Sequence, residues 1–265
     1  MKKFYVVGNP VKQSLSPKLF QYIFNVLDIN AKYLLYQPLS INDFNKFLYN
    51  EVDNISGLNI TMPYKILAYH SLNNHDALSE KIKSINCIKN INNKFVGYNT
   101  DYYGFTKMFK NLNIDQNDIL VLGNGGLAQT VAHSLLDNTT NQIYVWGRSK
   151  KNINQFINIF NSQRLKCYSK NIKKPVIINC LPINIIESDI DKIIKKILPT
   201  KIDLFIDLNY LETLFTQKLS NKNYNVIFGI DMFIFQALKS FDIWFDDKYH
   251  NKITYEEIKH LLTNE

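Results

Sequence analysis

Short apolar runs alternate with segments of helical periodicity along the N-terminal part of the chain. The strand-like runs, rich in β-branched and aromatic residues, cover residues 4–7, 33–38 and 58–61. The helical segments cover residues 17–27 and 41–49, and a third starts at Pro63. Ser16 and Pro17 have the residue types of an N-cap and a first helical position. Strands and helices in this order predict parallel α/β organisation.

The same alternation resumes at residue 119 around a glycine-rich turn. Its strand-like runs are residues 119–122, 143–146, 176–179 and 204–207. The first of them enters Gly123 directly, and a helix follows the turn through Leu136. The tail from Phe233 to Leu262 is amphipathic and helical, and we expect it to return to the first domain. The predicted domains are therefore residues 1–102, a nucleotide-binding domain at 103–235, and C-terminal helices at 236–265.

The composition agrees with an α/β protein that folds around a sizeable core. The chain has 265 residues, of which 46% are hydrophobic. No apolar stretch has membrane-spanning length, and the run after Met1 is too short for a signal peptide, so we expect a cytoplasmic protein without a membrane partner. Cys87, Cys167 and Cys180 are far apart and odd in number, which favours reduced thiols. The histidines lack metal-site spacing, and we predict no metal.

The charge and the glycine content bear on the ligands. A net charge of +8 is compatible with a nucleic-acid partner. The lysines are scattered, however, and no helix-turn-helix or finger pattern accompanies them. We therefore predict no nucleic-acid partner and a surface that favours anionic small molecules. Only nine residues are glycine, roughly half of the usual ~7% share, and nearly all of them lie in motifs where backbone geometry demands them.

The glycine-rich turn is a variant of the dinucleotide-binding fingerprint, because it follows a strand and precedes a helix. Its members are, in order, Gly123, Gly125, Gly126, Leu127 and Ala128. The next strand ends at Arg148 and Ser149 instead of at an acidic residue. A cation with a hydroxyl suits a 2′-phosphate, so we predict NADP(H) over NAD(H). An ordinary glycine turn and a solvated surface arginine are the alternatives.

Lys65 and Asp101 each follow a short polar run at the start of an expected helix. The runs are Gly57-Leu58-Asn59-Ile60-Thr61 and Gly97-Tyr98-Asn99-Thr100. A lysine–carboxylate pair can pass a proton to a carbonyl oxygen as that carbonyl receives hydride, and the ammonium stabilises the developing alkoxide. Polar groups suited to substrate hydroxyls are Asn59, Thr61, Asn86 and Thr100, and those suited to a carboxylate are Ser14 and Ser16.

Each of these residues also has a purely structural interpretation. Ser16 and Asp101 have the residue types of helix N-caps. Asn59 and Asn86 are typical of amides that satisfy loop backbone, and a lone lysine is usually solvated. The joint pattern, more than any single residue, favours a small-molecule substrate site.

At these residues the chain resembles the shikimate dehydrogenase family nearly end to end. The shared motifs are Ser14-x-Ser16-Pro17, Gly57-x-Asn59-Ile60-Thr61-x-Pro63-x-Lys65, Gly97-x-Asn99-Thr100-Asp101-x-x-Gly104, the glycine turn, Arg148-Ser149 and Gly229-x-x-Met232-x-x-x-Gln236. The resemblance implies NADPH-dependent reduction of 3-dehydroshikimate to shikimate in aromatic amino-acid biosynthesis. It also implies an N-terminal α/β substrate domain, a Rossmann-type NADP-binding domain, and C-terminal helices that return to the first domain.

The resemblance assigns roles to individual residues. It implies that Lys65 and Asp101 are the catalytic pair. The implied substrate contacts are Ser14, Ser16, Asn59, Thr61, Asn86, Asp101, Tyr210 and Gln236. The implied cofactor contacts are Gly123, Gly125, Gly126, Leu127, Ala128, Arg148 and Ser149, with Gly229 and Met232 near the nicotinamide.

Several positions depart from the family pattern. The usual His-Asn after the Ser-Pro helix start is Phe20-Gln21 here. Asn-Arg-Thr becomes Gly147-Arg148-Ser149, and Gly-Ala-Gly-Gly becomes a turn with Asn124 in second place. Leu181 replaces a threonine, and Asn184 replaces a glycine. These changes bear on cofactor affinity more than on the chemistry.

Two other interpretations stay open from the sequence. A quinate/shikimate dehydrogenase is closely related, although the serines at 14 and 16 favour shikimate. A catalytically silent protein that binds the same ligands is a second alternative, and the retained Lys65 and Asp101 argue against it. The sequence does not distinguish a monomer from a homodimer.

Overall fold

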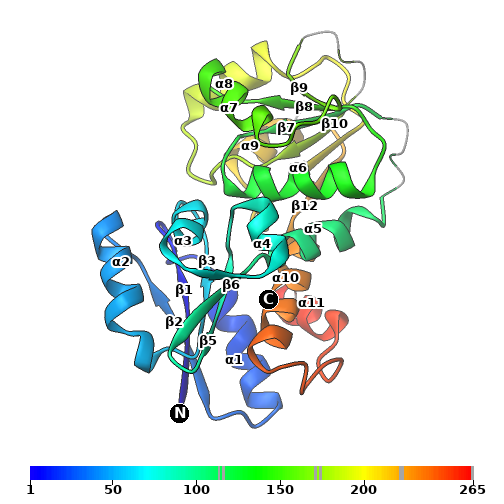
Figure 1. The fold of residues 1–265 in the computed structure, drawn as a ribbon. Helices are drawn as coiled ribbons and strands as arrows, with labels where there is room; N and C mark the ends of the chain where they lie inside the picture. Colours follow the sequence, from blue (N-terminus) through cyan, green and yellow to red (C-terminus); the bar gives the residue numbers. More distant parts are fainter. Residues whose placement is uncertain (113, 115–116, 170–171, 173–174, 221–223, 264–265) are drawn as a thin grey trace. The chain divides into compact units, whose positions relative to one another are not determined.

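The computed structural model describes residues 1–112, 114, 117–169, 172, 175–220 and 224–263. The chain divides into two units (Figure 1). Unit 1 comprises Met1–Gly104 and Ile234–Glu265, and unit 2 comprises Phe105–Phe233. Both boundaries fall within helices, α5 (Thr100–Phe109) and α10 (Ile230–Trp244), so each unit is described by itself.

Unit 1 is built on a mixed sheet with the strand order β2-β1-β3-β5-β6-β4. Its strands are β1 (Lys2–Val7), β2 (Ala31–Tyr36), β3 (Gly57–Ile60), β4 (Asn74–His75), β5 (Cys87–Ile91) and β6 (Lys94–Tyr98). Its other helical elements are α1 (Ser16–Val26), α2 (Ile41–Asn50), the 3₁₀ turn η1 (Val52–Asn54), α3 (Lys65–Ser71), α4 (Ala77–Ile82) and α11 (Tyr255–Thr263). β1 pairs in parallel with β2 and β3, so the loops that follow β1 and β3 leave the sheet at the same edge.

Successive residues of β1 face two different helical layers, because side chains of a strand alternate between its two sides. The ring of Phe4 lies 5.4 Å from that of Phe24 on α1 and 4.7 Å from that of Trp244 on α10. The ring of Tyr5 lies 5.4 Å from that of Phe47 on α2. Helices α1 and α10 therefore cover one face of the sheet, and α2 covers the other.

Unit 2 has a parallel sheet with the order β12-β11-β10-β7-β8-β9. Its strands are β7 (Ile119–Leu122), β8 (Ile143–Trp146), β9 (Leu165–Cys167), β10 (Val176–Asn179), β11 (Leu204–Asp207) and β12 (Val226–Phe228). Its other helices are α6 (Gly126–Asn138), α7 (Lys150–Asn158), α8 (Glu187–Lys196) and α9 (Leu214–Ser220). Numbered within the unit, the order is 3-2-1-4-5-6, which is the order of the Rossmann fold. The predicted α/β class with a Rossmann-type part is confirmed.

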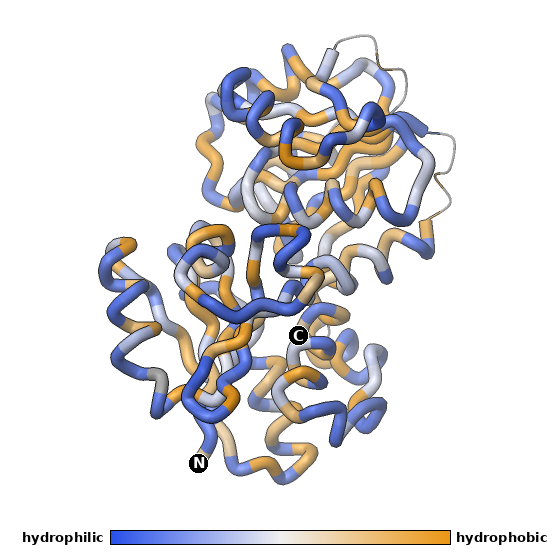
Figure 2. The backbone as a smooth tube through the Cα atoms, viewed as in Figure 1, coloured by the Kyte–Doolittle hydropathy of each residue, from blue (hydrophilic) through white to orange (hydrophobic). Residues whose placement is uncertain are grey.

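The core of unit 2 lies on both faces of this sheet. Ile119 and Val121 pack with α5, α6 and α7, whereas Leu120 and Leu122 pack with α8 and α9. Strands buried on both faces are apolar throughout their length, and Figure 2 shows hydrophobic stretches along these strands. This explains why the sequence marks them so clearly.

A hairpin interrupts the parallel order of unit 1. β5 is antiparallel to both β3 and β6, and the turn between β5 and β6 holds Asn92 and Asn93 at φ 51° and 60°. Asparagine tolerates this left-handed conformation, which two-residue hairpin turns require. The expectation of a wholly parallel arrangement is therefore wrong for this part of the sheet.

Two expected helix starts are also wrong. Helix α1 begins at Ser16 itself, after Leu15, and Ser14 Oγ accepts a hydrogen bond from Ser16 N at 3.2 Å. Helix α3 begins at Lys65, after Tyr64, and not at Pro63. None of the helices in the described ranges combines the length and apolar character needed to cross a bilayer.

Candidate active site

Lys65 and Asp101 meet at the N-termini of two helices of unit 1. Lys65 is the first residue of α3, and Asp101 is the second residue of α5. Lys65 Nζ lies 2.5 Å from Asp101 Oδ2, and the two side chains are 14% and 7% exposed. A pair so far removed from water interacts more strongly than a surface pair.

The capping of α5 shows that Asp101 is not the N-cap. Asn99 Oδ1 accepts a hydrogen bond from Tyr102 N at 3.0 Å, which is the N-cap interaction of this helix. Ser16 is likewise not the cap of α1. The structural interpretation of these two residues as caps is therefore wrong, and the Asp101 carboxylate is available to Lys65.

Asn86 joins the start of α5 to α10 within unit 1. Its Oδ1 accepts from Thr100 N at 2.6 Å, and its Nδ2 donates to Thr100 Oγ1 at 2.9 Å and to Gln236 Oε1 at 3.3 Å. Thr100 precedes Asp101 directly. Of the residues predicted for a substrate site, the structure thus brings together Asn86, Thr100, Asp101, Lys65 and Gln236.

Asn59 is buried on β3, and both its amide oxygen and its amide nitrogen form hydrogen bonds. Its Oδ1 accepts from Tyr33 Oη at 2.7 Å, and its Nδ2 donates to Ser240 Oγ at 3.0 Å and to Asn86 O at 3.3 Å. Ser240 Oγ also lies 3.0 Å from Thr100 Oγ1. These partners give Asn59 a positioning role, and its expected contact with substrate stays a prediction.

Tyr33 and Ser240 are site residues that the sequence reasoning missed. Ser240 follows Gln236 by one helical turn, so both lie on one face of α10. The spacing from Gln236 was the available signal for Ser240. Nothing local marks Tyr33, whose partner Asn59 lies on another strand.

Ser14 and Thr61 lie on the loops that follow β1 and β3, and Ser16 is the first residue of α1 after the first of these loops. Thr61 N donates to Val7 O at 2.8 Å, which fixes Thr61 beside the start of the loop after β1. A Cβ at Gly8 would lie 2.2 Å from Thr61 Cγ2, so only glycine fits there. Ser14 lies on the same loop as Gly8, Ser16 starts the helix that follows it, and the carboxylate contact of both serines stays a prediction.

In unit 2, the glycine turn has the geometry of a phosphate cradle. Gly123 has a φ of 113°, which favours glycine. Gly125 is the N-cap of α6, and a Cβ built on it would meet no atom within 4 Å. The open space above Gly125 faces the N-terminus of a long helix, where N–H groups and the helix dipole favour an anion. These residues fit a dinucleotide pyrophosphate.

The end of β8 presents positive charge and no carboxylate. The side chain of Arg148 is 85% exposed, and its Nη1 lies 4.0 Å from Asp189 Oδ2, which is a weak surface pair. Ser149 caps α7 by accepting a hydrogen bond from Asn152 N at 3.3 Å, so its O–H remains able to donate. Both residues suit a phosphate monoester, and their contact with a 2′-phosphate stays a prediction.

The remaining predicted contacts also lie in unit 2. The Tyr210 ring packs 4.6 Å from Phe233. A Cβ at Gly229 would lie 2.5 Å from Leu208 O, so glycine is required at this position. Met232 is 4% exposed and belongs to the core, as does the buried Ala128, whereas Leu127 packs against it from a half-buried position. The expected substrate contact of Tyr210 stays a prediction.

A buried polar cluster at the ends of β10 and β11 was not predicted. Asp207 accepts hydrogen bonds from Asn179 Nδ2 at 3.1 Å, Asn209 N at 3.0 Å and Thr213 Oγ1 at 3.2 Å. Burial raises the pKa of the Asp207 carboxyl, although these hydrogen bonds act in the opposite direction. The cluster orders the loop that starts with Cys180 and lies against Gly123.

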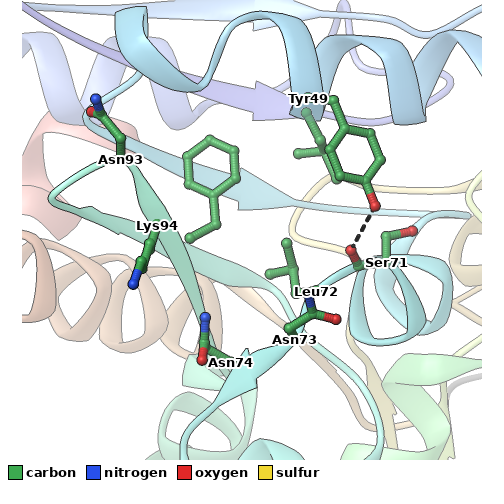
Figure 3. A pocket seen from close by; sticks show the side chains of 9 residues that line it. Tyr49, Ser71, Leu72, Asn73, Asn74, Asn93 and Lys94 are labelled. Carbon is green, nitrogen blue, oxygen red and sulfur yellow. Dashed lines mark hydrogen bonds between the residues drawn. The ribbon is translucent and has the colours of Figure 1, made fainter.

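A cavity of about 240 Å³ opens elsewhere in unit 1 (Figure 3). Its walls include Leu72 after α3, and Asn93 and Lys94 at the β5–β6 turn. This turn lies at the opposite end of β6 from Tyr98, which leads into Asp101. Neither Lys65 nor Asp101 lines the cavity, so it is separate from the candidate site.

One group with metal-ligand chemistry occurs among the described residues, at the end of α10. The potential ligand atoms of Asp242, Asp247 and His250 lie within 4.8 Å of one another. His250 Nδ1 already lies 2.9 Å from Asp242 Oδ2 as an ordinary surface pair. The predicted absence of a metal stays a prediction.

Known proteins resemble the chain over nearly all of its length. The sequence profile described as "Shikimate dehydrogenase substrate binding domain" matches residues 6–88. A "Shikimate dehydrogenase (NADP(+))" from Clostridium beijerinckii is 32% identical and covers 96% of both chains, and one from Aquifex aeolicus is 29% identical and covers 90% of this chain and 89% of its own. The crystal structure of shikimate dehydrogenase 1 from Peptoclostridium difficile is 26% identical, covers 98% of both chains and superposes with a TM-score of 0.81.

Proposed function

The chain belongs to the shikimate dehydrogenase family, and from this premise we propose that it interconverts 3-dehydroshikimate and shikimate as an NADP-dependent oxidoreductase. This reaction serves aromatic amino-acid biosynthesis. The observation that supports the proposal most directly is the Lys65–Asp101 pair, which joins two helix N-termini inside a cluster of polar side chains.

Lys65 is the proton donor in the reducing direction. NADPH supplies hydride to the carbonyl carbon when it is bound. The Lys65 ammonium stabilises the negative charge that develops on the carbonyl oxygen and transfers a proton to it. Asp101 holds Lys65 in place. After each reduction Lys65 regains a proton from solvent, and in the oxidising direction the pair accepts the hydroxyl proton of shikimate and releases it to solvent.

The other polar residues of unit 1 orient the substrate. Asn86, Thr100 and Gln236 offer amide and hydroxyl groups to the ring hydroxyls, and Ser14 and Ser16 donate to the carboxylate. In unit 2, the residues at the N-terminus of α6 hold the pyrophosphate, and Arg148 and Ser149 bind the 2′-phosphate. Such a phosphate contact favours NADP over NAD.

A Lys65→Met variant tests the catalytic assignment. It removes the ammonium and keeps the apolar stem, so oxidation of shikimate by NADP⁺ should slow about 10²–10⁴-fold, the usual contribution of a general acid–base group. NADPH binding, measured by fluorescence titration, should be unchanged. The readout is the rate of NADPH formation.

Lys89→Met is the matched control for this experiment. Lys89 also forms a part-buried ion pair in unit 1, with Asp246, but it lies outside the polar cluster. The control should keep turnover within a few-fold of the parent. If both variants lose turnover equally, or if Lys65→Met keeps it, Lys65 is not the proton donor.

A further inference from the structure

The half-buried side chain of Asn124 stands in the space that a side chain at position 147 would occupy. β7 and β8 pair in parallel with Leu122 opposite Trp146, and Gly123 N donates to Trp146 O at 2.8 Å. The residues after both strands are therefore neighbours. A Cβ built on Gly147 would lie 3.1 Å from Asn124 Oδ1, which is closer than most real Cβ contacts.

Position 147 is the place where NAD-binding sheets carry an acidic residue for the ribose 2′-hydroxyl, because it directly follows the second strand of the fold. Here that position has no side chain, and an amide from the glycine turn fills the space. Asn124 and Gly147 are also two of the positions at which the chain departs from the family pattern. The structure shows that these two departures are adjacent in space.

The amide of Asn124 is available to a ligand. It makes no side-chain hydrogen bond with the residues that the structure describes, although it is half-buried. Arg148 follows Gly147 directly, and its side chain is extended into solvent. The Asn124 amide lies against position 147, and Arg148 and Ser149 are the next two residues, so these three side chains can supply several donors to one phosphate monoester.

We propose that Asn124 is a specificity-determining residue for the cofactor. Its amide occupies the space beside Gly147 and binds the ribose 2′-phosphate from there, together with Arg148. The inference rests on the proposed function, because it assumes that NADP is the cofactor. The backbone of the glycine turn would bind the pyrophosphate, whereas the side chain of Asn124, its second residue, would bind the 2′-phosphate.

Adenosine 2′,5′-bisphosphate and 5′-AMP, titrated calorimetrically, test the inference without catalysis. The two probes differ in the 2′-phosphate. Asn124→Ala should weaken binding of the bisphosphate about tenfold or more, as expected for a hydrogen bond to a charged group, and binding of 5′-AMP less than about twofold. An equal loss for both probes, or no loss, would show that Asn124 only shapes the turn.

Two double variants provide a matched rescue. Asn124→Ala with Gly147→Asn moves the amide to the other side of the same space and should restore bisphosphate binding to within a few-fold of the parent. Asn124→Ala with Gly147→Ala adds the same Cβ, which lies 2.8 Å from the flexible end of Ile153, but no amide, and should not restore it. Equal binding by the two double variants would overturn the inference.

The parent protein separates this inference from the proposed function. If the parent binds the bisphosphate no more tightly than 5′-AMP, the NADP assignment itself fails, and the inference fails with it. If the parent prefers the bisphosphate and oxidises shikimate with NADP⁺ while Asn124→Ala changes nothing, only the role of Asn124 is overturned.

Discussion

Lys65 and Asp101 are positioned by two consecutive residues that precede β5. Ile85 N donates to Lys65 O at 3.0 Å, which ties the first residue of α3 to this segment. The side chain of the next residue, Asn86, binds both the N–H and the hydroxyl of Thr100. Backbone and amide contacts therefore fix the positions from which the Lys65 and Asp101 side chains, the proposed catalytic pair, reach each other.

Ser240 is the residue through which α10 supports this arrangement. A Ser240→Ala variant removes one buried hydrogen-bond partner from Asn59 and one from Thr100, which should lower the free energy of unfolding by about 1–3 kcal/mol. The KM for shikimate should rise several-fold, because Thr100 and Gln236 lose a common support. Denaturant unfolding and steady-state kinetics measure the two effects.

Ser134→Ala is the control for Ser240→Ala. The Ser134 hydroxyl pairs with that of Thr106 at 2.6 Å in unit 2 and is equally buried. Its loss should destabilise the protein comparably and leave the KM for shikimate unchanged. If the KM for shikimate is also unchanged in Ser240→Ala, Ser240 only stabilises the fold and does not support the substrate site.

At the residue scale, the sequence pointed to the candidate proton-transfer residues but not to the residues that position them. Lys65 and Asp101 lie in sequence motifs, and a motif can be recognised because its residues are close together in the chain. Ser240 bonds to Asn59 across a separation of 181 residues, and Tyr33 bonds to Asn59 from another strand. Such contacts arise only when the sheet and α10 assemble, so no local pattern predicts them.

Strands β10 and β11 end in a polar pair whose titration depends on the fold. Asp207 is the last residue of β11, and burial raises the pKa of its carboxyl above the ordinary value of 3.8. The unfolded chain therefore ionises Asp207 at lower pH than the folded protein does. The contribution of Asp207 to stability must fall as the pH rises from about 3.8 through the raised pKa, and the full penalty applies above it.

An Asp207→Asn variant should reveal this penalty. The unfolding free energy of the variant minus that of the parent should increase as the pH rises from about 3.8, because only the parent must bury a charge. Urea unfolding at several pH values measures this difference. A difference that stays flat or falls with rising pH would contradict the assigned role of burial.

Asp191 provides a comparison of opposite sign. A hydrogen bond from Lys218 lowers the pKa of its carboxyl, so its contribution to stability is present above the ordinary value and lost as the pH falls. The unfolding free energy of Asp191→Asn minus that of the parent should therefore decrease as the pH rises, because only the parent gains the ionised Asp191–Lys218 pair.

At the scale of elements, the central strands of unit 2 could be predicted to the residue. Residues 119–122, 143–146, 176–179 and 204–207 are short apolar runs, and burial on both faces makes such runs continuous. The short edge strands β9 and β12 and the β5–β6 hairpin were missed. Their pairing depends on neighbours in the sheet and on the Asn92–Asn93 turn, whose signal was present but unused.

At the scale of the whole molecule, unit 1 is not complete without the C-terminal segment. Trp244 of α10 donates its ring N–H to Ile88 O at 2.9 Å and packs where Gly57 leaves room, since a Cβ there would lie 2.5 Å from Trp244 Nε1. The chain therefore finishes the fold of unit 1 only after unit 2. The return of the tail could be anticipated from its amphipathic pattern, whereas the fit between Trp244 and Gly57 could not.

The proposed function requires that this one protein uses shikimate and NADP together. The most direct measurement is the near-ultraviolet absorbance of the reduced cofactor, followed with the purified chain in four mixtures: shikimate or quinate, each with NADP⁺ or NAD⁺. We predict rapid reduction with shikimate and NADP⁺. The rate should be at least about tenfold lower with NAD⁺, which lacks the charged 2′-phosphate, and it should also be lower with quinate. No reduction in any mixture, or the fastest reduction with quinate and NAD⁺, would contradict the account.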